Sequence, residues 1–183
     1  MSLLKTIDQK FNELQTILEN RDRTSIKIDA HGGNSILLVY PLTEELSYIN
    51  RIKKEYPNAY FVDIAHLFVS YIDSIGLENM EEYFNDTGEI IKQFKSQHID
   101  CDFEKMILNE ISKAKQQSKI PVLIRTGALY GTGIDNNNII DSEIVRQSPK
   151  PVILLYPATL SKDNKLMFLG FKRASDYRAI IIN

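Results

Sequence analysis

The fold is decided by Ile120-Pro121-Val122-Leu123-Ile124, an apolar run that continues directly into Arg125-Thr126-Gly127-Ala128-Leu129-Tyr130. A second run of the same kind, Pro151-Val152-Ile153-Leu154-Leu155, continues into Tyr156-Pro157-Ala158. Continuous runs of Val, Ile and Leu indicate strands that are buried on both faces, as in a parallel sheet. Because a long helical pattern precedes the first run, the sequence predicts a three-layer α/β fold in which helices flank a mostly parallel sheet.

Two earlier strands complete the expected core of this sheet. Residues 35–41 and 59–64 are both rich in apolar residues, and a helical pattern follows each of them. The first of these helices is expected to turn one apolar face inward, formed by Leu46, Ile49, Ile52 and Tyr56.

Capping signals indicate where two further helices begin. Thr6 and Gln9 fit a capping box, in which each side chain satisfies the other residue's free backbone amide. Asp100 or Asp102 suits the N-cap of a longer helix, and the whole region 76–118 is expected to be helical. The inner face of the longer helix is expected to consist of Phe103, Ile107, Ile111 and Ala114.

The last third is expected to add a loop and an antiparallel edge. The segment from Gly131 to Asn138 is polar and glycine-rich, which predicts a surface loop. Residues 166–171 and 177–182 are joined by a short link, so they are expected to pair antiparallel at one sheet edge. With 183 residues, the chain is expected to fold as a single domain, residues 1–183.

Composition limits the classes of partner. A net charge of -2 gives no general attraction to nucleic acid or anionic lipid. A local basic patch remains open, and its candidates are Lys113, Lys115, Lys119, Lys172 and Arg173. Direct DNA contact is therefore kept only as a minor alternative.

Cysteine usage and hydropathy favour a cytosolic protein. Cys101 is the only cysteine, which rules out an intrachain disulfide and a multi-cysteine metal site. No apolar stretch approaches the ~20 residues that a membrane-spanning helix needs. A cytoplasmic location without membrane contact is expected.

The motifs that carry common enzyme chemistry are missing. Gly32-Gly33 precedes a strand, whereas a phosphate-binding loop follows one and contains a Lys-Ser/Thr pair. His31, His66 and His98 are scattered, which does not fit the helical zinc motif, and no Gly-x-Ser-x-Gly elbow occurs. No catalytic residue, metal or cofactor is expected, and an enzymatic function is not favoured.

Arg125 is the strongest candidate for a special role. A guanidinium at the end of a buried strand needs a carboxylate, carbonyl groups or a phosphate as its partner. Either Arg125 pairs internally with Asp63, or it binds an anion or a partner's carboxylate in a crevice. The expected crevice lies at the strand ends and is formed by Tyr40, Asp63, Arg125, Thr126, Gly127 and Tyr156. Both tyrosines precede a proline, so they are expected at the same sheet edge, where the proline stops the strand.

Together, these strand endings resemble the BrxB family of the bacterial BREX anti-phage systems. The resemblance is carried by Ile124-Arg125-Thr126-Gly127-Ala128-Leu129-Tyr130, Val152-Ile153-Leu154-Leu155-Tyr156-Pro157-Ala158, Phe168-Leu169-Gly170-Phe171 and Tyr177-Arg178. The chain departs from the family between Gly131 and Asn138, where it is polar and the family usually has an apolar Pro-Phe segment.

The resemblance implies a non-catalytic accessory subunit of a phage-defence complex. Its expected partners are an alkaline-phosphatase-like protein of the PglZ type and other subunits of the complex. It also implies a sheet similar to a P-loop NTPase core that lacks the phosphate loop. The alternative is a nucleotide-binding or small-molecule-binding enzyme that uses the crevice at the carboxyl ends of the strands.

Overall fold

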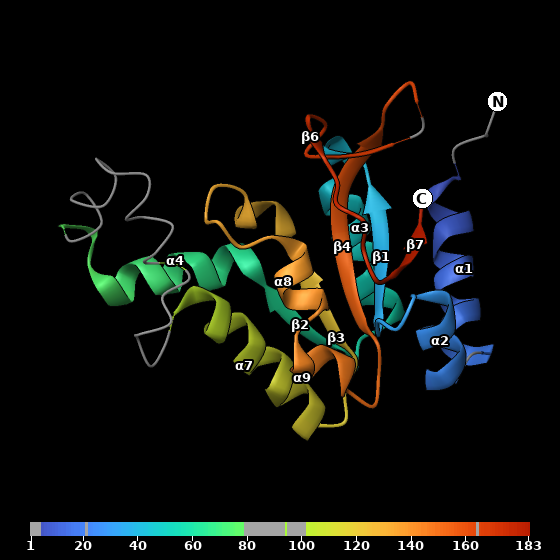
Figure 1. Ribbon diagram of the computed structural model, residues 1–183, viewed down its shortest axis with the longest axis horizontal. Helices are drawn as coiled ribbons and strands as arrows, with labels where there is room; N and C mark the ends of the chain where they lie inside the picture. Colours follow the sequence, from blue (N-terminus) through green and yellow to red (C-terminus); the bar gives the residue numbers. More distant parts are fainter. Residues whose placement is uncertain (1–4, 21, 79–93, 95–101, 164) are drawn as a thin grey trace.

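The computed structural model describes residues 5–20, 22–78, 94, 102–163 and 165–183, which form an α/β unit around a parallel sheet (Figure 1). The strands follow the order β2-β3-β4-β1-β7, and every neighbouring pair along this path is parallel. The path comprises β1 (Ser35–Tyr40), β2 (Tyr60–Asp63), β3 (Pro121–Ile124), β4 (Val152–Leu160) and β7 (Ile180–Ile182). The expected α/β class and mostly parallel sheet are therefore confirmed.

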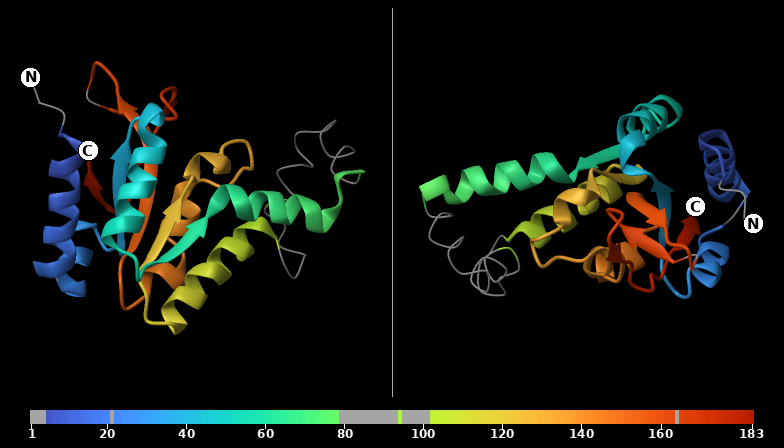
Figure 2. Two further views of the ribbon diagram at one scale, coloured as in Figure 1. Left: turned by 180° about the vertical axis from the view of Figure 1, so that it is seen from behind. Right: turned by 90° about the horizontal axis from the view of Figure 1, so that it is seen from above.

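Helices cover both faces of the sheet, as expected (Figures 1 and 2). Alternate residues of β1 enter two separate cores, because successive side chains of a strand point to opposite faces. One core contains Ile36, Leu38 and Tyr40, and it is closed by α1 (Ile7–Asn20), α2 (Arg23–Asp29) and α3 (Glu45–Glu55).

The other core contains Leu37 and Val39 of β1 and lies under the remaining helices. These are α4 (Ile64–Ile75), α7 (Phe103–Gln116), α8 (Asn136–Ile140) and α9 (Glu143–Arg146). Figure 2 shows α4 and α7 running side by side beyond the edge of the sheet.

The predicted capping signals are confirmed. The Thr6 amide donates to Gln9 Oε1 at 2.9 Å, and the Gln9 amide donates to Thr6 Oγ1 at 3.3 Å. Asp102 caps α7 by accepting from the Lys105 amide at 2.7 Å. The predicted inner face of α7 is fully buried. Asp100, Cys101 and most of the region expected to be helical between α4 and α7 lie outside the described residues.

The helix after β1 packs differently than its apolar spacing predicts. A 3-10 turn, η1 (Leu42–Glu44), comes before α3. Leu46 is 65% exposed instead of buried, and Tyr48 takes its place in the core between Phe11 and Tyr40. The prediction was wrong at Leu46 because the aromatic cluster with α1 sets which side of α3 turns inward.

The expected antiparallel pair at the end of the chain is also wrong. β7 pairs in parallel with β1, while β5 (Leu166–Phe168) pairs antiparallel with residues 158–160 and with β6 (Lys172–Arg173). The physical reason is that β4 does not stop at Pro157. Proline removes only a donor, and the Pro157 carbonyl still accepts the Leu169 amide at 2.8 Å. The extended end of β4 thus holds β5.

The polar segment from Gly131 to Asn138 is not wholly a surface loop. Thr132, Ile134 and Asn136 are all buried, and α8 begins within the segment. Thr132 can be buried because its hydroxyl donates to the Leu129 carbonyl at 2.7 Å. The segment packs against the domain and forms part of the surface discussed below.

Within the described part of the chain, each helix is too short or too polar to cross a lipid bilayer.

Candidate functional site

The carboxyl ends of β2, β3, β4 and β1 lie along one edge of the sheet, because these strands run parallel. After β1 the chain enters the core closed by α3, whereas after β4 it enters the opposite core through Phe168 and Tyr177. The connections therefore change faces between β1 and β4. In open α/β sheets, ligands bind at such a switch point.

Arg125 and Asp63 form an ion pair at this edge. Arg125 follows β3 in the left-handed backbone region, with φ 55°, and its guanidinium contacts the Asp63 carboxylate. The other Asp63 oxygen accepts the His66 amide at 3.3 Å and so caps α4. The internal pairing that the sequence left open is therefore present, and it fixes the end of β3 to the start of α4.

Thr126 and Gly127 serve packing at the same edge. The buried Thr126 hydroxyl donates to the Leu155 carbonyl of β4 at 2.7 Å. A Cβ on Gly127 would lie 3.2 Å from Leu169 Cδ2 and 3.7 Å from Pro157 Cγ. Both residues join the turn after β3 tightly to β4 and to the loop after β5.

The two tyrosines lie at the same edge but in opposite cores. Tyr40 donates to Glu45 Oε1 at 2.7 Å, and the Tyr156 and Tyr177 hydroxyls are 2.8 Å apart. Both Tyr40 and Tyr156 are 0% exposed, and burial raises the pKa of both phenols. The six candidate residues thus do not line one open crevice, since the tyrosines are enclosed and Tyr40 lies across the sheet from Tyr156.

The segments that carry the family resemblance do meet in space. Tyr156 stacks on Phe168 with ring centroids 5.0 Å apart, and it contacts Tyr177 edge-on at 5.4 Å. The Leu169 amide reaches the Pro157 carbonyl, and Gly127 packs under Leu169. Segments from four places in the sequence therefore build one cluster.

This cluster presents two exposed aromatic rings to solvent. Tyr130 and Phe171, 54% and 58% exposed, contact each other edge-to-face at a centroid distance of 5.2 Å. We call these two residues the aromatic pair. Beside Tyr130 lies a hollow of about 220 Å³, bounded by Ile134, Phe168 and the Lys172–Asp135 ion pair. An exposed aromatic pair next to a hollow is suited to anchoring a protein partner.

A second hollow, of about 320 Å³, lies at the carboxyl end of β1 and includes Lys10 of α1. Lys10 was not among the residues predicted to form a site, although its position in the sequence is unusual for a lysine. Lys10 lies three residues after Ile7 and four before Leu14, so it belongs to the apolar stripe of its helix. A lysine at such a position must bury its charge, and Lys10 is 6% exposed.

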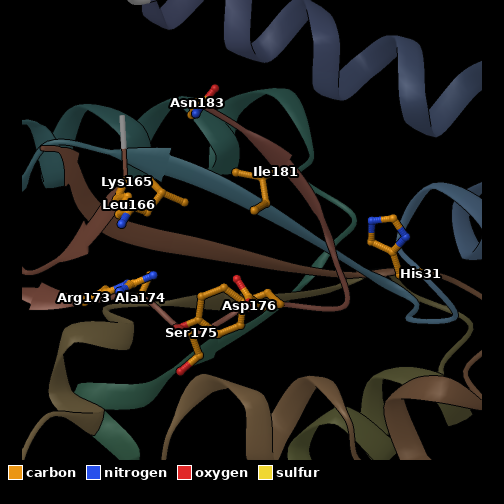
Figure 3. A pocket seen from close by; sticks show the side chains of 10 residues that line it. His31, Lys165, Leu166, Arg173, Ala174, Ser175, Asp176, Ile181 and Asn183 are labelled. Carbon is orange, nitrogen blue, oxygen red and sulfur yellow. The ribbon is translucent and has the colours of Figure 1, made fainter. Parts of the chain in front are cut away.

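Figure 3 shows a third and more open hollow, of about 500 Å³, over β7. Lys165 and Arg173 lie on one side of it and His31 lies on the other, with Asp176 between them. All four of these side chains are exposed. Charges that are fully hydrated bind a ligand weakly, so this hollow is the poorer candidate.

The five residues of the suggested basic patch lie in two separate parts of the structure. Lys113, Lys115 and Lys119 lie at the end of α7 and before β3, whereas Lys172 and Arg173 form β6 beyond the carboxyl end of β4. The amino and carboxyl ends of parallel strands are opposite edges of the sheet, as Figure 1 shows. Lys113 and Lys172 also pair with Glu110 and Asp135.

Within the described residues, no group of three or more His, Cys, Asp or Glu side chains is arranged to hold a metal ion. Comparison of the chain with protein-family models, with curated proteins and with solved structures gave no match.

Proposed function

We propose that this protein is a non-catalytic assembly subunit of a bacterial anti-phage complex of the BREX type, similar to BrxB. One observation carries the proposal. The four segments on which the resemblance rests pack into one cluster, and that cluster exposes the aromatic pair. A set of motifs that builds a surface instead of a reactive centre fits a protein that binds other proteins.

The polar groups of the cluster are used internally. Asp63 neutralises Arg125, the Thr126 hydroxyl bonds to β4, and the Tyr156 hydroxyl bonds to Tyr177. Such contacts fix the positions of Tyr130 and Phe171 before any partner arrives. Rigid aromatic side chains lose little conformational freedom on binding, which favours them as anchors at interfaces. The partner we propose is a PglZ-type alkaline-phosphatase-like protein.

The proposal includes a relationship between the sheet and the core of P-loop NTPases, without the phosphate loop. In a P-loop, glycines and a Lys-Ser/Thr pair connect a strand to its helix. Here the connection from β1 to α3 contains Pro41 and the short turn η1. This connection supports a binding or assembly role without a nucleotide cofactor, and we propose that the complex is cytoplasmic.

Co-purification with a co-expressed PglZ-type protein tests the proposal. The wild-type chain is expected to retain the partner through affinity and size-exclusion steps. A double variant, Tyr130→Ser with Phe171→Ser, is expected to lose at least about tenfold in affinity, because aromatic anchors at an interface contribute about 2 kcal/mol or more each.

The matched control replaces two other exposed apolar residues, Leu42→Ser in η1 with Leu46→Ser in α3, which are 48% and 65% exposed. This control is expected to bind like wild type. Absence of a complex with the wild-type chain, or equal losses in both double variants, would refute the proposal.

A further inference from the structure

The hollow at the carboxyl end of β1 is lined by the start of α1, the turn η1, α3 and the extended end of β4. Asn183, which follows β7, completes the lining. Most of its lining is apolar, including Ile7, Pro41, Tyr48 and Leu160. Its volume of about 320 Å³ lies at the lower end of the range for small-molecule sites. It also lies beside the β1–β4 switch point.

Lys10 places a positive charge in this apolar hollow. Its ammonium donates to the Val39 carbonyl at 2.8 Å and lies 5.8 Å from the centre of the Tyr48 ring. An ammonium has three donors, and the bond to Val39 is the one hydrogen bond that the Lys10 ammonium makes within the described residues. No carboxylate of those residues comes within 4.0 Å of it. Burial lowers the pKa of Lys10, and the charge of Glu44 opposes this shift.

The first turn of α1 adds to the positive potential. Thr6 and Ile7 line the hollow, and α1 is 14 residues long. The capping box satisfies the amides of Thr6 and Gln9, so the amides of Ile7 and Asp8 have no partner among the described residues. Free amides at a helix N-terminus attract anions.

We propose that this hollow binds a compact organic acid whose carboxylate or phosphate contacts the Lys10 ammonium and the first turn of α1. The apolar body of the acid packs against Ile7, Pro41, Tyr48 and Leu160. The apolar lining requires such a body, while the buried ammonium requires an anionic group. This site is separate from the aromatic pair, and its existence does not depend on the assembly function.

Glu44 limits the charge of the ligand. It lines the same hollow, so its carboxylate repels an anion that is bound at Lys10. A singly charged acid therefore fits the hollow better than a polyanion such as a nucleoside triphosphate. Replacement of this carboxylate by an amide, Glu44→Gln, is expected to tighten the binding of acids severalfold.

Calorimetric titration with three probes of similar shape tests the proposal: benzoate, phenyl phosphate and the neutral benzyl alcohol. At least one acid is expected to bind about tenfold or more tightly than the alcohol, because a hydrogen bond to a charged group contributes about 1.5–3 kcal/mol. Preference for benzoate identifies a carboxylate as the natural group, and preference for phenyl phosphate identifies a phosphate. Equal binding of acids and alcohol, or no binding of either acid, overturns the proposal.

Two variants locate the binding. Lys10→Met keeps the length and apolar body of the side chain, and it is expected to weaken the better acid about ten- to a hundredfold without changing the affinity for the alcohol. Lys54→Met, which changes an exposed lysine of α3, is the matched control and is expected to bind the acid like wild type. Unchanged acid binding by Lys10→Met overturns the proposal. If Lys10→Met does not fold, Glu44→Gln provides the test. Unchanged or weaker binding of the acid by Glu44→Gln would contradict the binding of its anionic group at Lys10.

Discussion

At the scale of single residues, Arg125 combines a strained backbone with a specific partner. Its φ of 55° is a conformation that favours glycine, yet the side chain at this position holds Asp63. Asp63 is itself fixed, because it also caps α4. The ion pair and the left-handed turn therefore depend on each other, and together they set the direction in which the segment toward Tyr130 leaves β3.

Two substitutions of Arg125 separate these effects. Arg125→Ala loses the ion pair and keeps a left-handed residue with a Cβ, whereas Arg125→Gly loses the same ion pair and removes the strain. Urea unfolding is expected to show Arg125→Gly to be more stable than Arg125→Ala by about 1 kcal/mol. Equal stability of the two variants, or a more stable alanine variant, would mean that the turn does not hold this conformation.

The ionisation of Tyr48 makes the free energy of unfolding depend on pH in the alkaline range. Burial raises the pKa of Tyr48 to about 12 in the folded chain, compared with about 10 in an unfolded chain. A raised folded pKa gives stability that is fully present below pH ~10 and is lost as the pH rises to ~12, since the unfolded state loses its proton first.

The free energy of unfolding of the wild-type chain is therefore expected to fall more steeply between pH ~10 and ~12 than that of Tyr48→Phe, by about 2 kcal/mol over this window. Tyr40 and Tyr156 are kept in both chains, so their contributions cancel in the comparison. Parallel curves for the two proteins would show that Tyr48 ionises as easily in the folded state as in the unfolded state.

At the scale of elements, the sequence predicted strands and helices better than it predicted their partners. The apolar runs and the caps at Thr6 and Asp102 are local signals, and all of them are confirmed. The pairing of β7 with β1 was not predicted, because a run of three isoleucines fits equally well beside β1 or beside residues 166–171. The continuation of β4 through Pro157 was missed because the hydrogen bond that permits it comes from Leu169, in a different part of the chain.

Gly33 tests how β7 is held next to β1. A Cβ at this position would lie 1.7 Å from the Arg178 carbonyl oxygen, so the backbone before β7 lies directly against the turn before β1. Gly33→Ala is expected to lower the free energy of unfolding by about 3 kcal/mol or more, because a backbone contact has to move. Urea unfolding gives the loss, and faster amide exchange at Ile180–Ile182 shows where it arises.

The neighbouring glycine is the matched control. Gly32 has a φ of +90°, but a Cβ added to it would meet no atom within 4 Å, so Gly32→Ala carries backbone strain without a clash. It is expected to lose only about 1 kcal/mol. Similar losses in the two variants would contradict the close contact between Gly33 and Arg178.

At the scale of the whole molecule, the carboxyl edge of the sheet carries two different kinds of surface. On one side of the sheet, the clustered segments expose the aromatic pair beside the hollow that the Lys172–Asp135 ion pair borders. On the other side, α1 and α3 enclose the apolar hollow that contains Lys10. The two sites share β4, but Lys10 lies in α1 and the aromatic pair lies on other elements, so each can be substituted without touching the other.

The sequence predicts which residues lie at this edge of the sheet, but not which of them are exposed on its surface. The positions of Asp63, Arg125 and Tyr156 follow from strand ends, and the Arg125–Asp63 pair was one of two stated possibilities. The enclosure of the two tyrosines was not predictable, since that of Tyr156 depends on β5 and Tyr177 and that of Tyr40 depends on the packing of α3. The place of Lys10 in the apolar stripe of its helix is a local signal, but its hydrogen-bond partner Val39 lies 29 residues away in the chain.

The most direct test of the assembly proposal is amide hydrogen exchange of the chain, free and bound to its PglZ-type partner. If the aromatic pair is the contact surface, amide exchange at residues 126–131 and 168–173 is expected to be slower in the bound state. The exchange rates of α1 and α3 are expected to stay the same. Protection confined to α1, α3 or the outer face of α7, with those two segments exchanging as in the free chain, would contradict it.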